Sequence, residues 1–243
     1  MNHPGRPALG KVAGALAAAG AVHAAPLVTS LPLLRPLWPA LAGHGTAGHV
    51  ALTFDDGPDA ASTPQFLDVL ARHEVHATFF LLGEMVERFP DLPRRMVDAG
   101  HELAVHSWDH RNHLRHPPGR TTEQLARTAQ LIERRSGTRP MFFRPPYGAL
   151  TAAGLRAAAS VGLTPVLWTA WGRDWTARAD AASVLAQVTS GAVAGGTVLL
   201  HDSDCTSAPG AWHSAHQALP DLLAWCRRRG LDVGKLAEHG LRR

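Results

Sequence analysis

Two adjacent carboxylates stand at the end of a predicted strand. Asp55 and Asp56 follow the apolar run 50–54, and the Gly57-Pro58 pair behind them forces a turn. Neighbouring residues that leave a strand point in different directions, so the two acids can take different tasks. One carboxylate is suited to ligate a metal ion while the other stays available as a base. A solvated Asp-Asp-Gly turn is the structural alternative for these residues taken alone.

Two histidines at ligand spacing form the second candidate feature. His106 and His110 lie four residues apart, directly after the predicted strand 102–105. If this segment makes a helical turn, both imidazoles face one ion, although single histidines are more often structural. One Asp and two His make a three-ligand set that leaves positions open for water and substrate. The divalent metal expected for this set is Zn²⁺, and Co²⁺ or Ni²⁺ fit similar ligands.

Further polar residues follow other predicted strands. Arg144 can hold a carboxylate through two parallel hydrogen bonds. The two prolines after it leave the Tyr147 N–H as a fixed donor, although Pro-Pro-Tyr-Gly is also typical of a stiff loop. Asp174 and Trp175 follow one predicted strand, and His201 ends another. The carboxyl ends of barrel strands form a catalytic face, so this shared placement favours one common site.

Strand-like and helix-like segments alternate along the sequence from residue 49 onward. We expect strands over 50–54, 77–82, 102–105, 141–143, 163–168 and 197–200. We expect helices over 64–73, 94–99, 121–137 and 219–229, the third opened by a capping box at Thr121–Gln124. Repeated alternation of this kind indicates a parallel α/β sheet, and the number of units favours a barrel over a small open sheet.

Five short motifs, in this order, resemble those of a known enzyme family. They read T-F-D-D-G-P at 53–58, H-S-W-D-H at 106–110, R-P-P-Y-G at 144–148, D-W at 174–175 and L-L-H at 199–201. From His49 to the C-terminus the chain looks like a polysaccharide deacetylase of carbohydrate esterase family four, with the nodulation-protein-B-type homology domain. The resemblance implies an α/β fold, namely a distorted (β/α) barrel related to the TIM barrel, with incomplete repeats.

The resemblance also implies which residues bind metal and which move protons. The expected general base is Asp55, the expected general acid is His201, and the expected metal ligands are Asp56, His106 and His110.

Five further residues are expected to support that chemistry. By the same resemblance, Arg144 would orient the base, Asp174 would tune the acid, and the Tyr147 N–H would contribute to an oxyanion hole. Trp175 and Leu199 would line a pocket for the acetyl methyl group, so that these two residues and Tyr147 would contact the substrate.

One position departs from the family pattern. The fourth motif of the family often reads D-x-x-D-W, whereas this chain has Trp171 where the first Asp would stand. Because Asp174 and Trp175 remain, we expect altered substrate contacts rather than lost chemistry. Trp171 is either a platform on which a sugar stacks or a core residue.

The activity implied by the resemblance is hydrolysis of a carbon–nitrogen bond other than a peptide bond. General acid/base attack of a metal-bound water would remove N-acetyl groups from a GlcNAc-containing glycan of the chitin or peptidoglycan type and release acetate. One alternative is the same fold acting on O-acetyl esters or another small amide. The other alternative is a catalytically silent carbohydrate-binding relative, which acetate release from N-acetylated glucosamine oligomers would distinguish from an enzyme.

Charge is unevenly distributed along the 243 residues. The formal net charge is +4, with 24 Lys and Arg against 20 Asp and Glu. No acidic residue precedes Asp55, whereas Arg6, Lys11 and Arg35 lie in that stretch. The remainder is nearly neutral, which argues against a nucleic-acid partner.

The N-terminal residues differ in composition from the rest. Residues 1–25 have basic residues ahead of an Ala-rich apolar run, as in a signal peptide or an N-terminal anchor, and this run is a poor transmembrane helix. A Pro-rich connecting segment, 26–48, would lead into the catalytic domain, 49–243. We therefore expect a secreted or cell-envelope-associated monomer, in contact with a membrane only through that anchor, or a cytoplasmic protein if the leader is not a signal.

Four residues near the C-terminus carry weaker signals. Cys205 and Cys226 can form one disulfide if the chain is exported, whereas in the cytosol such residues are more often small buried side chains. His213 and His216 have a spacing that suggests a metal site, but we expect them to be surface histidines.

Overall fold

Eight parallel strands form one curled sheet in the computed structural model, which describes residues 17–241 except 32, 118 and 192. The strands are β1 (His49–Asp55), β2 (Thr78–Leu81), β3 (Glu102–Val105), β4 (Phe142–Phe143), β5 (Thr164–Pro165), β6 (Ala170–Trp171), β7 (Thr197–His201) and β8 (Asp232–Gly234). Their order is β5-β4-β3-β2-β1-β7-β6, and β8 pairs with the first half of β1. No ladder joins β5 to β6 within the described part of the chain. The predicted distorted, incomplete (β/α) barrel is confirmed.

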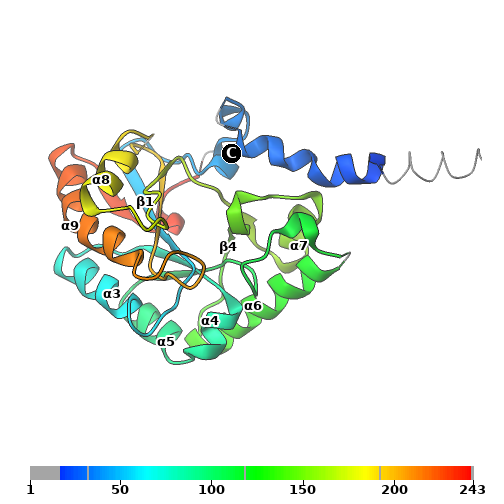
Figure 1. Ribbon diagram of the computed structural model, residues 1–243, viewed down its shortest axis with the longest axis horizontal. Coiled ribbons are helices and arrows are strands. Elements are labelled where there is room, and N and C mark those ends of the chain that lie inside the picture. Colours follow the sequence, from blue (N-terminus) through cyan, green and yellow to red (C-terminus); the bar gives the residue numbers. More distant parts are fainter. Residues whose placement is uncertain (1–16, 32, 118, 192, 242–243) are drawn as a thin grey trace, which may run out of the picture.

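Helices lie between most successive strands, although none lies between β5 and β6, and they surround the curled sheet (Figure 1). They are α2 (Pro39–Ala42), α3 (Thr63–Arg72), α4 (Gly83–Arg88), α5 (Leu92–Asp98), α6 (Arg120–Ser136), α7 (Ala152–Val161), α8 (Ala181–Thr189) and α9 (Trp212–Arg228). Short 3₁₀ segments are η1 (Ala25–Ser30), η2 (Arg35–Leu37), η3 (His113–Arg115), η4 (Pro146–Gly148) and η5 (Leu236–Glu238). Residues 17–24 are also helical and project from the body.

Alternating side chains of β1 contact two apolar clusters and so fix which residues face the site. Phe54 points outward and packs on Phe66 of α3 and Phe79 of β2, with ring centroids 5.2 and 4.9 Å apart. The large cluster that contains these rings lies between the strands and the helices. A smaller buried cluster comprises Ala51, Phe80, Ala104, Val166 and Leu236. Thr53 and Asp55 share the inward face with Ala51, because side chains alternate along a strand.

Most predicted elements are confirmed to within a few residues, but two differ in extent. The strand predicted at 163–168 is shorter than expected: only β5 falls within it, because the carbonyls of Val166 and Leu167 accept hydrogen bonds from Arg144, and β6 lies beyond the predicted range. The last helix begins at Trp212 instead of 219, and Pro220 lies inside it.

The helix predicted over 121–137 is α6, but the predicted capping box is wrong. Gly119 precedes the first turn in a left-handed conformation, and no side chain caps the helix. Gln124 instead accepts a hydrogen bond from Ser107 at 2.8 Å, and Thr121 is hydrogen-bonded to His116 at 3.1 Å. The side chains expected to cap the helix therefore hold the loop that follows β3.

The segment before β1 is hydrogen-bonded to the barrel. The Leu41 carbonyl accepts from Leu167 N–H at 2.7 Å, and the Gly43 carbonyl accepts from Thr197 Oγ1 at 2.8 Å. This segment therefore joins the β5–β6 connection to the start of β7. Of the predicted leader, residues 1–16 lie outside the described residues. A search of the described helices finds none with the length and apolar character needed to span a membrane.

Candidate active site

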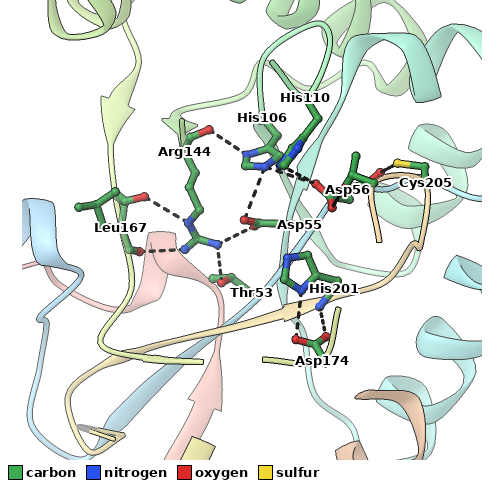
Figure 2. Close-up of polar contacts among 12 residues, drawn as sticks. Thr53, Asp55, Asp56, His106, His110, Arg144, Leu167, Asp174, His201 and Cys205 are labelled. Carbon is green, nitrogen blue, oxygen red and sulfur yellow. Dashed lines mark hydrogen bonds and ion pairs between the residues drawn. The ribbon is translucent and has the colours of Figure 1, made fainter. Parts of the chain in front are cut away.

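A cavity of about 210 Å³ lies at the carboxyl ends of the strands. Its lining residues are Asp55, Asp56, His106, His110, Pro145, Tyr147, Gly148, Trp168, Trp175, Leu199, His201, Thr206 and Ser207. Figure 2 shows the carboxylates and imidazoles converging from segments that are far apart in the sequence. Every residue expected to bind metal or to move a proton lines this cavity. Arg144 and Asp174 contact two of these residues from behind.

Asp56, His106 and His110 each place one potential ligand atom around a common point. Asp56 Oδ1 lies 3.4 Å from His106 Nε2 and 3.5 Å from His110 Nε2. Ligand atoms held by one tetrahedral ion at about 2.0–2.1 Å are about 3.3 Å apart, so the observed separations match those around a shared ion. In the part of the chain that the structure describes, this is the one group of three such ligands.

The protonation of these side chains also suits a cation. Asp56 is 1% exposed, and its Oδ1 has no hydrogen-bond donor among the described residues. Burial acts to raise the pKa of Asp56, but the close contact with His106 and the positive charge of His201 outweigh it and hold that pKa well below its usual range. Burial lowers the pKa of His110 to about 4, so its imidazole is neutral at pH 7. A buried carboxylate oxygen that faces a neutral imidazole fits a divalent ion.

Neighbouring groups hold the potential ligand side chains in position. His106 Nδ1 donates to the Arg144 carbonyl at 2.8 Å, which leaves Nε2 facing Asp56. Thr206 Oγ1 donates to Asp56 Oδ2 at 2.5 Å, and the Cys205 thiol contacts the Asp56 carbonyl at 3.4 Å. Although Cys205 is exposed as a residue, desolvation of its thiol and the nearby charge of Asp56 raise the pKa of the thiol to about 12, so it is uncharged near neutral pH.

The second carboxylate, Asp55, is held on the other side by Arg144. The guanidinium is fully buried and donates to Asp55 Oδ1 at 2.7 Å and to Thr53 Oγ1 at 2.9 Å. It also donates to the Val166 and Leu167 carbonyls, at 3.3 and 2.9 Å. Burial lowers the pKa of Arg144 while the Asp55 charge opposes that shift. Asp55 Oδ2 remains directed toward the cavity, 3.8 Å from His106 Nε2.

His201 is paired with a buried carboxylate in the same way. Its Nδ1 lies 3.1 Å from Asp174 Oδ1, and its backbone N–H donates to Asp174 Oδ2 at 2.7 Å. Burial acts to lower the pKa of His201, but the charge and hydrogen bond of Asp174, together with the charges of Asp56 and Asp55, raise it to about 10. The imidazole thus keeps its proton near neutral pH, and its Nε2 makes no hydrogen bond among the described residues.

Tyr147 offers a backbone donor at the mouth of the cavity. Its φ is +60°, and within the described residues its N–H makes no hydrogen bond. The ring is 64% exposed and contacts His110, with centroids 4.5 Å apart. The backbone N–H that Pro145 and Pro146 precede is therefore available to an oxygen in the cavity.

Tryptophans form one wall of the cavity. Trp175 and Leu199 line it, as expected, and Trp168 lines it without having been predicted. Trp171 lies behind them, half-buried, with its ring 5.0 Å from Trp175 and 5.8 Å from Trp168. Trp171 therefore supports the two tryptophans that face the cavity.

Thr206 and Ser207 are the other lining residues that sequence reasoning missed. They lie in an irregular loop after the fifth motif, and no periodicity marks them.

Both cysteines are free in the structure. His213 is exposed, and its Nδ1 donates to the Gly210 carbonyl at 2.9 Å. His216 is half-buried against Phe66.

The fold and the site together define a class of proteins. An incomplete (β/α) barrel brings together, at the ends of its strands, the Asp56, His106 and His110 group, the Asp55–Arg144 pair and the His201–Asp174 pair. A family model described as polysaccharide deacetylase matches residues 42–166. The chain belongs to the polysaccharide deacetylase family, which confirms the resemblance carried by the five motifs.

Named relatives place the chain more closely within that family. It is 36% identical to a chitooligosaccharide deacetylase of Bradyrhizobium sp., over 78% of this chain and 89% of that protein. It is 39% identical to the peptidoglycan-N-acetylglucosamine deacetylase PgdA of Listeria monocytogenes, over 67% of this chain. The match spans only 34% of PgdA, about a third of its length. The crystal structure of the Bc1960 peptidoglycan N-acetylglucosamine deacetylase superposes with a TM-score of 0.77 at 30% identity, covering 86% of this chain and 96% of that one.

Proposed function

We propose that this protein is a metal-dependent hydrolase that removes N-acetyl groups from a GlcNAc-containing polysaccharide or oligosaccharide. The observation that carries the proposal is the convergence on one cavity of a carboxylate held by Arg144 and an imidazolium held by Asp174. Amide hydrolysis requires such a pair, because water must lose a proton and the leaving nitrogen must gain one. The names of the relatives, chitooligosaccharide and peptidoglycan-N-acetylglucosamine deacetylases, agree with an acetamido sugar as substrate.

The proposed reaction uses six residues of this chain. Asp55 takes a proton from the attacking water, and Arg144 orients that carboxylate through a hydrogen bond. The Tyr147 N–H donates to the carbonyl oxygen as it gains negative charge. His201 gives its proton to the amide nitrogen as the C–N bond breaks, so that acetate and a free amino sugar leave. Trp175 and Leu199 enclose the acetyl methyl group.

We propose that Asp56, His106 and His110 hold Zn²⁺. When bound there, the ion supplies Lewis-acid polarisation of the amide carbonyl. The neutral nitrogen and carboxylate ligands suit Zn²⁺, and Co²⁺ or Ni²⁺ would be accepted by the same set. The metal is first removed with a chelator, and each metal is then added back singly. Adding a metal back should raise the melting temperature of the protein, and elemental analysis should find one Zn²⁺ per chain. His106→Ala should bind no ion.

The activity is tested by acetate release from three polymers in the presence of Zn²⁺. The proposal expects acetate from N-acetylglucosamine oligomers or peptidoglycan. Release from acetyl-xylan alone would establish an O-acetyl esterase instead. Binding of oligomers with no acetate from any polymer would establish a silent carbohydrate-binding relative.

We further propose that the chain is exported or anchored at the cell envelope through residues 1–25 and acts as a monomer. A cell-wall glycan lies outside the membrane, so an enzyme that acts on it must cross or be tethered to that membrane. Mass spectrometry of the protein purified from its native cells should show a mature N-terminus near Ala25. A full-length N-terminus in the cytosolic fraction would contradict this assignment.

A further inference from the structure

A second cavity adjoins the catalytic one. It has a volume of about 640 Å³, within the range of ligand pockets, and shares His110 and Tyr147 with the first cavity. The other lining residues come from the loop after β3 and from the start of α6: Arg111, Asn112, Arg115, His116, Pro117 and Arg120. A chain of sugars bound with one unit in the catalytic cavity can therefore place a neighbouring unit here.

The walls of this second cavity are cationic. Three guanidinium groups line it, and the carboxylate that faces them is that of Asp109, which is 7% exposed. Asp109 Oδ2 lies 3.7 Å from both Arg111 and Arg120, too far for a strong hydrogen bond to either. The Arg115 side chain is exposed and makes no ion pair or hydrogen bond among the described residues. Arginine donors thus outnumber the acceptors that the protein provides.

The start of α6 adds to the positive potential at this cavity. Arg120 is the first residue of this helix, and no side chain caps its N-terminus. The N-terminal end of a helix carries partial positive charge, which favours an anion nearby.

The loop that carries the arginines is fixed in place. Ser107 Oγ is hydrogen-bonded to Gln124 of α6 at 2.8 Å and to His113 Nε2 at 2.9 Å. Asn112 Oδ1 accepts from the Leu114 N–H at 3.0 Å, and this contact caps η3. A positively charged wall on a rigid loop loses less entropy when it binds a ligand than a mobile one does.

We propose that this cavity is a subsite for a carboxylate-bearing unit of the glycan, next to the acetamido sugar that is hydrolysed. The proposal rests on the proposed deacetylase function and narrows its substrate class to an acidic glycan. A carboxylate offers two coplanar oxygens, which match the paired N–H donors of a guanidinium. A neutral chain of acetamido sugars has no group that would use these charges.

The test compares three N-acetylated oligosaccharides of equal length. The first contains only N-acetylglucosamine, the second carries a carboxylate on every alternate sugar, and the third is the second with its carboxylates amidated. For each one, kcat/KM is measured by acetate release and Kd by calorimetry. The wild-type protein should prefer the acidic oligomer to its amidated form, and added NaCl should weaken that preference.

Arg115→Gln removes the guanidinium that has no partner, and Arg135→Gln, an exposed arginine near the other end of α6, is the matched control. Loss of a charge-assisted hydrogen bond should lower the acidic-to-amidated ratio of kcat/KM about 10-fold in Arg115→Gln, through KM. Arg135→Gln should keep the wild-type ratio.

The two proposals fail in different ways. Equal kcat/KM and Kd for the acidic and amidated oligomers, or a ratio that Arg115→Gln does not change, would overturn the subsite. If no oligomer yields acetate, the deacetylase function fails, and the calorimetric preference of wild-type and Arg115→Gln proteins decides the subsite by itself.

Discussion

Asp55 and Asp56 are adjacent in the sequence, but they differ in backbone conformation and in the side chains that they contact. Asp55 ends β1 in extended backbone, whereas Asp56 has a φ of +77°, a left-handed conformation that is uncommon for a residue with a side chain. The turn aims Asp55 at Arg144 and Asp56 at the two histidines. The left-handed backbone at Asp56 therefore gives the two carboxylates different partners, as the different tasks proposed for them require.

The two acids should give different phenotypes when each is changed to the amide. Asp55→Asn should keep the metal and lower kcat about 10²–10⁴-fold, because a general base is lost. Asp56→Asn should lose the metal, since an amide oxygen is a weaker ligand than a carboxylate. Elemental analysis and acetate release on the same preparations measure both effects. Asp68→Asn, at an exposed site on α3, is the control, and an active Asp55→Asn would falsify the assignment of the base.

The pair of Asp174 and His201 predicts a shift in the pH–rate profile. The acid is active while protonated, so the rate falls as the pH rises through the pKa of His201, which is raised to about 10 without an ion. A bound divalent ion offsets the charges of Asp55 and Asp56, so the alkaline limb of the pH–rate profile lies at a lower pH in the metal-bound enzyme. Asp174→Asn removes a charge that raises this pKa and should move the alkaline limb to still lower pH.

The control for that experiment is Asp221→Asn, which removes an exposed carboxylate from α9. Its alkaline limb should coincide with that of the wild-type protein. An Asp174→Asn profile that also coincides with the wild type would show that His201 is not the group that titrates.

At the scale of elements, Arg144 joins parts of the barrel that no strand ladder connects. Its side chain reaches from the end of β4 to Thr53 and Asp55 of β1, and to two carbonyls between β5 and β6. The guanidinium also lies 4.0 Å above the Phe80 ring. A single side chain therefore orients the proposed base and closes the gap in the sheet.

Arg144→Met should be strongly destabilising. It leaves the buried Asp55 carboxylate without its partner and two carbonyls without donors, which costs about 3–5 kcal/mol of unfolding free energy. Urea denaturation measures this loss. The double variant Arg144→Met/Asp55→Asn should recover part of the stability, because it removes the unpaired charge. Strictly additive losses would mean that the two side chains are not coupled.

The sequence predicts the strands and the residues at their ends well, because both leave local signals. Apolar runs followed by Asp-Asp-Gly-Pro or by two spaced histidines mark a strand and a ligand together. The end of β5 before Val166 and Leu167 leaves no such signal, since it depends on Arg144, which follows another strand. Thr206 and Trp168 were missed for the same reason: each reaches the cavity through tertiary packing.

At the scale of the whole molecule, the folded unit extends ahead of the predicted domain start at residue 49. The Thr46 N–H donates to the His239 carbonyl at 2.8 Å, and the Gly45 N–H donates to Gly195 at 2.9 Å. Together with the Leu41 and Gly43 contacts, these hydrogen bonds join residues 41–46 to the β5–β6 connection, to the start of β7 and to the C-terminal segment.

Truncation measures how much that segment contributes. A chain of residues 25–243 should melt at the temperature of the full-length protein. A chain of residues 49–243 loses the four hydrogen bonds named above, and at about 1 kcal/mol each its melting temperature should fall by about 8–16 °C. Differential scanning calorimetry of both chains decides where the domain begins. Equal melting temperatures would place the start at residue 49.

The position of β1 in the sheet determines when the site can be completed. Asp55 is in register with Phe80 of β2 and with His201 of β7, so the first strand of the barrel stays unpaired on one side until nearly the whole chain exists. Pairing across such a separation makes folding slow, because a long loop must close before its contacts form. The three proposed ligand side chains all lie in the first half of the chain, whereas the proposed acid arrives with a late strand. During synthesis, the proposed metal ligands therefore emerge before the proposed acid, and the site is complete only when β7 pairs with β1.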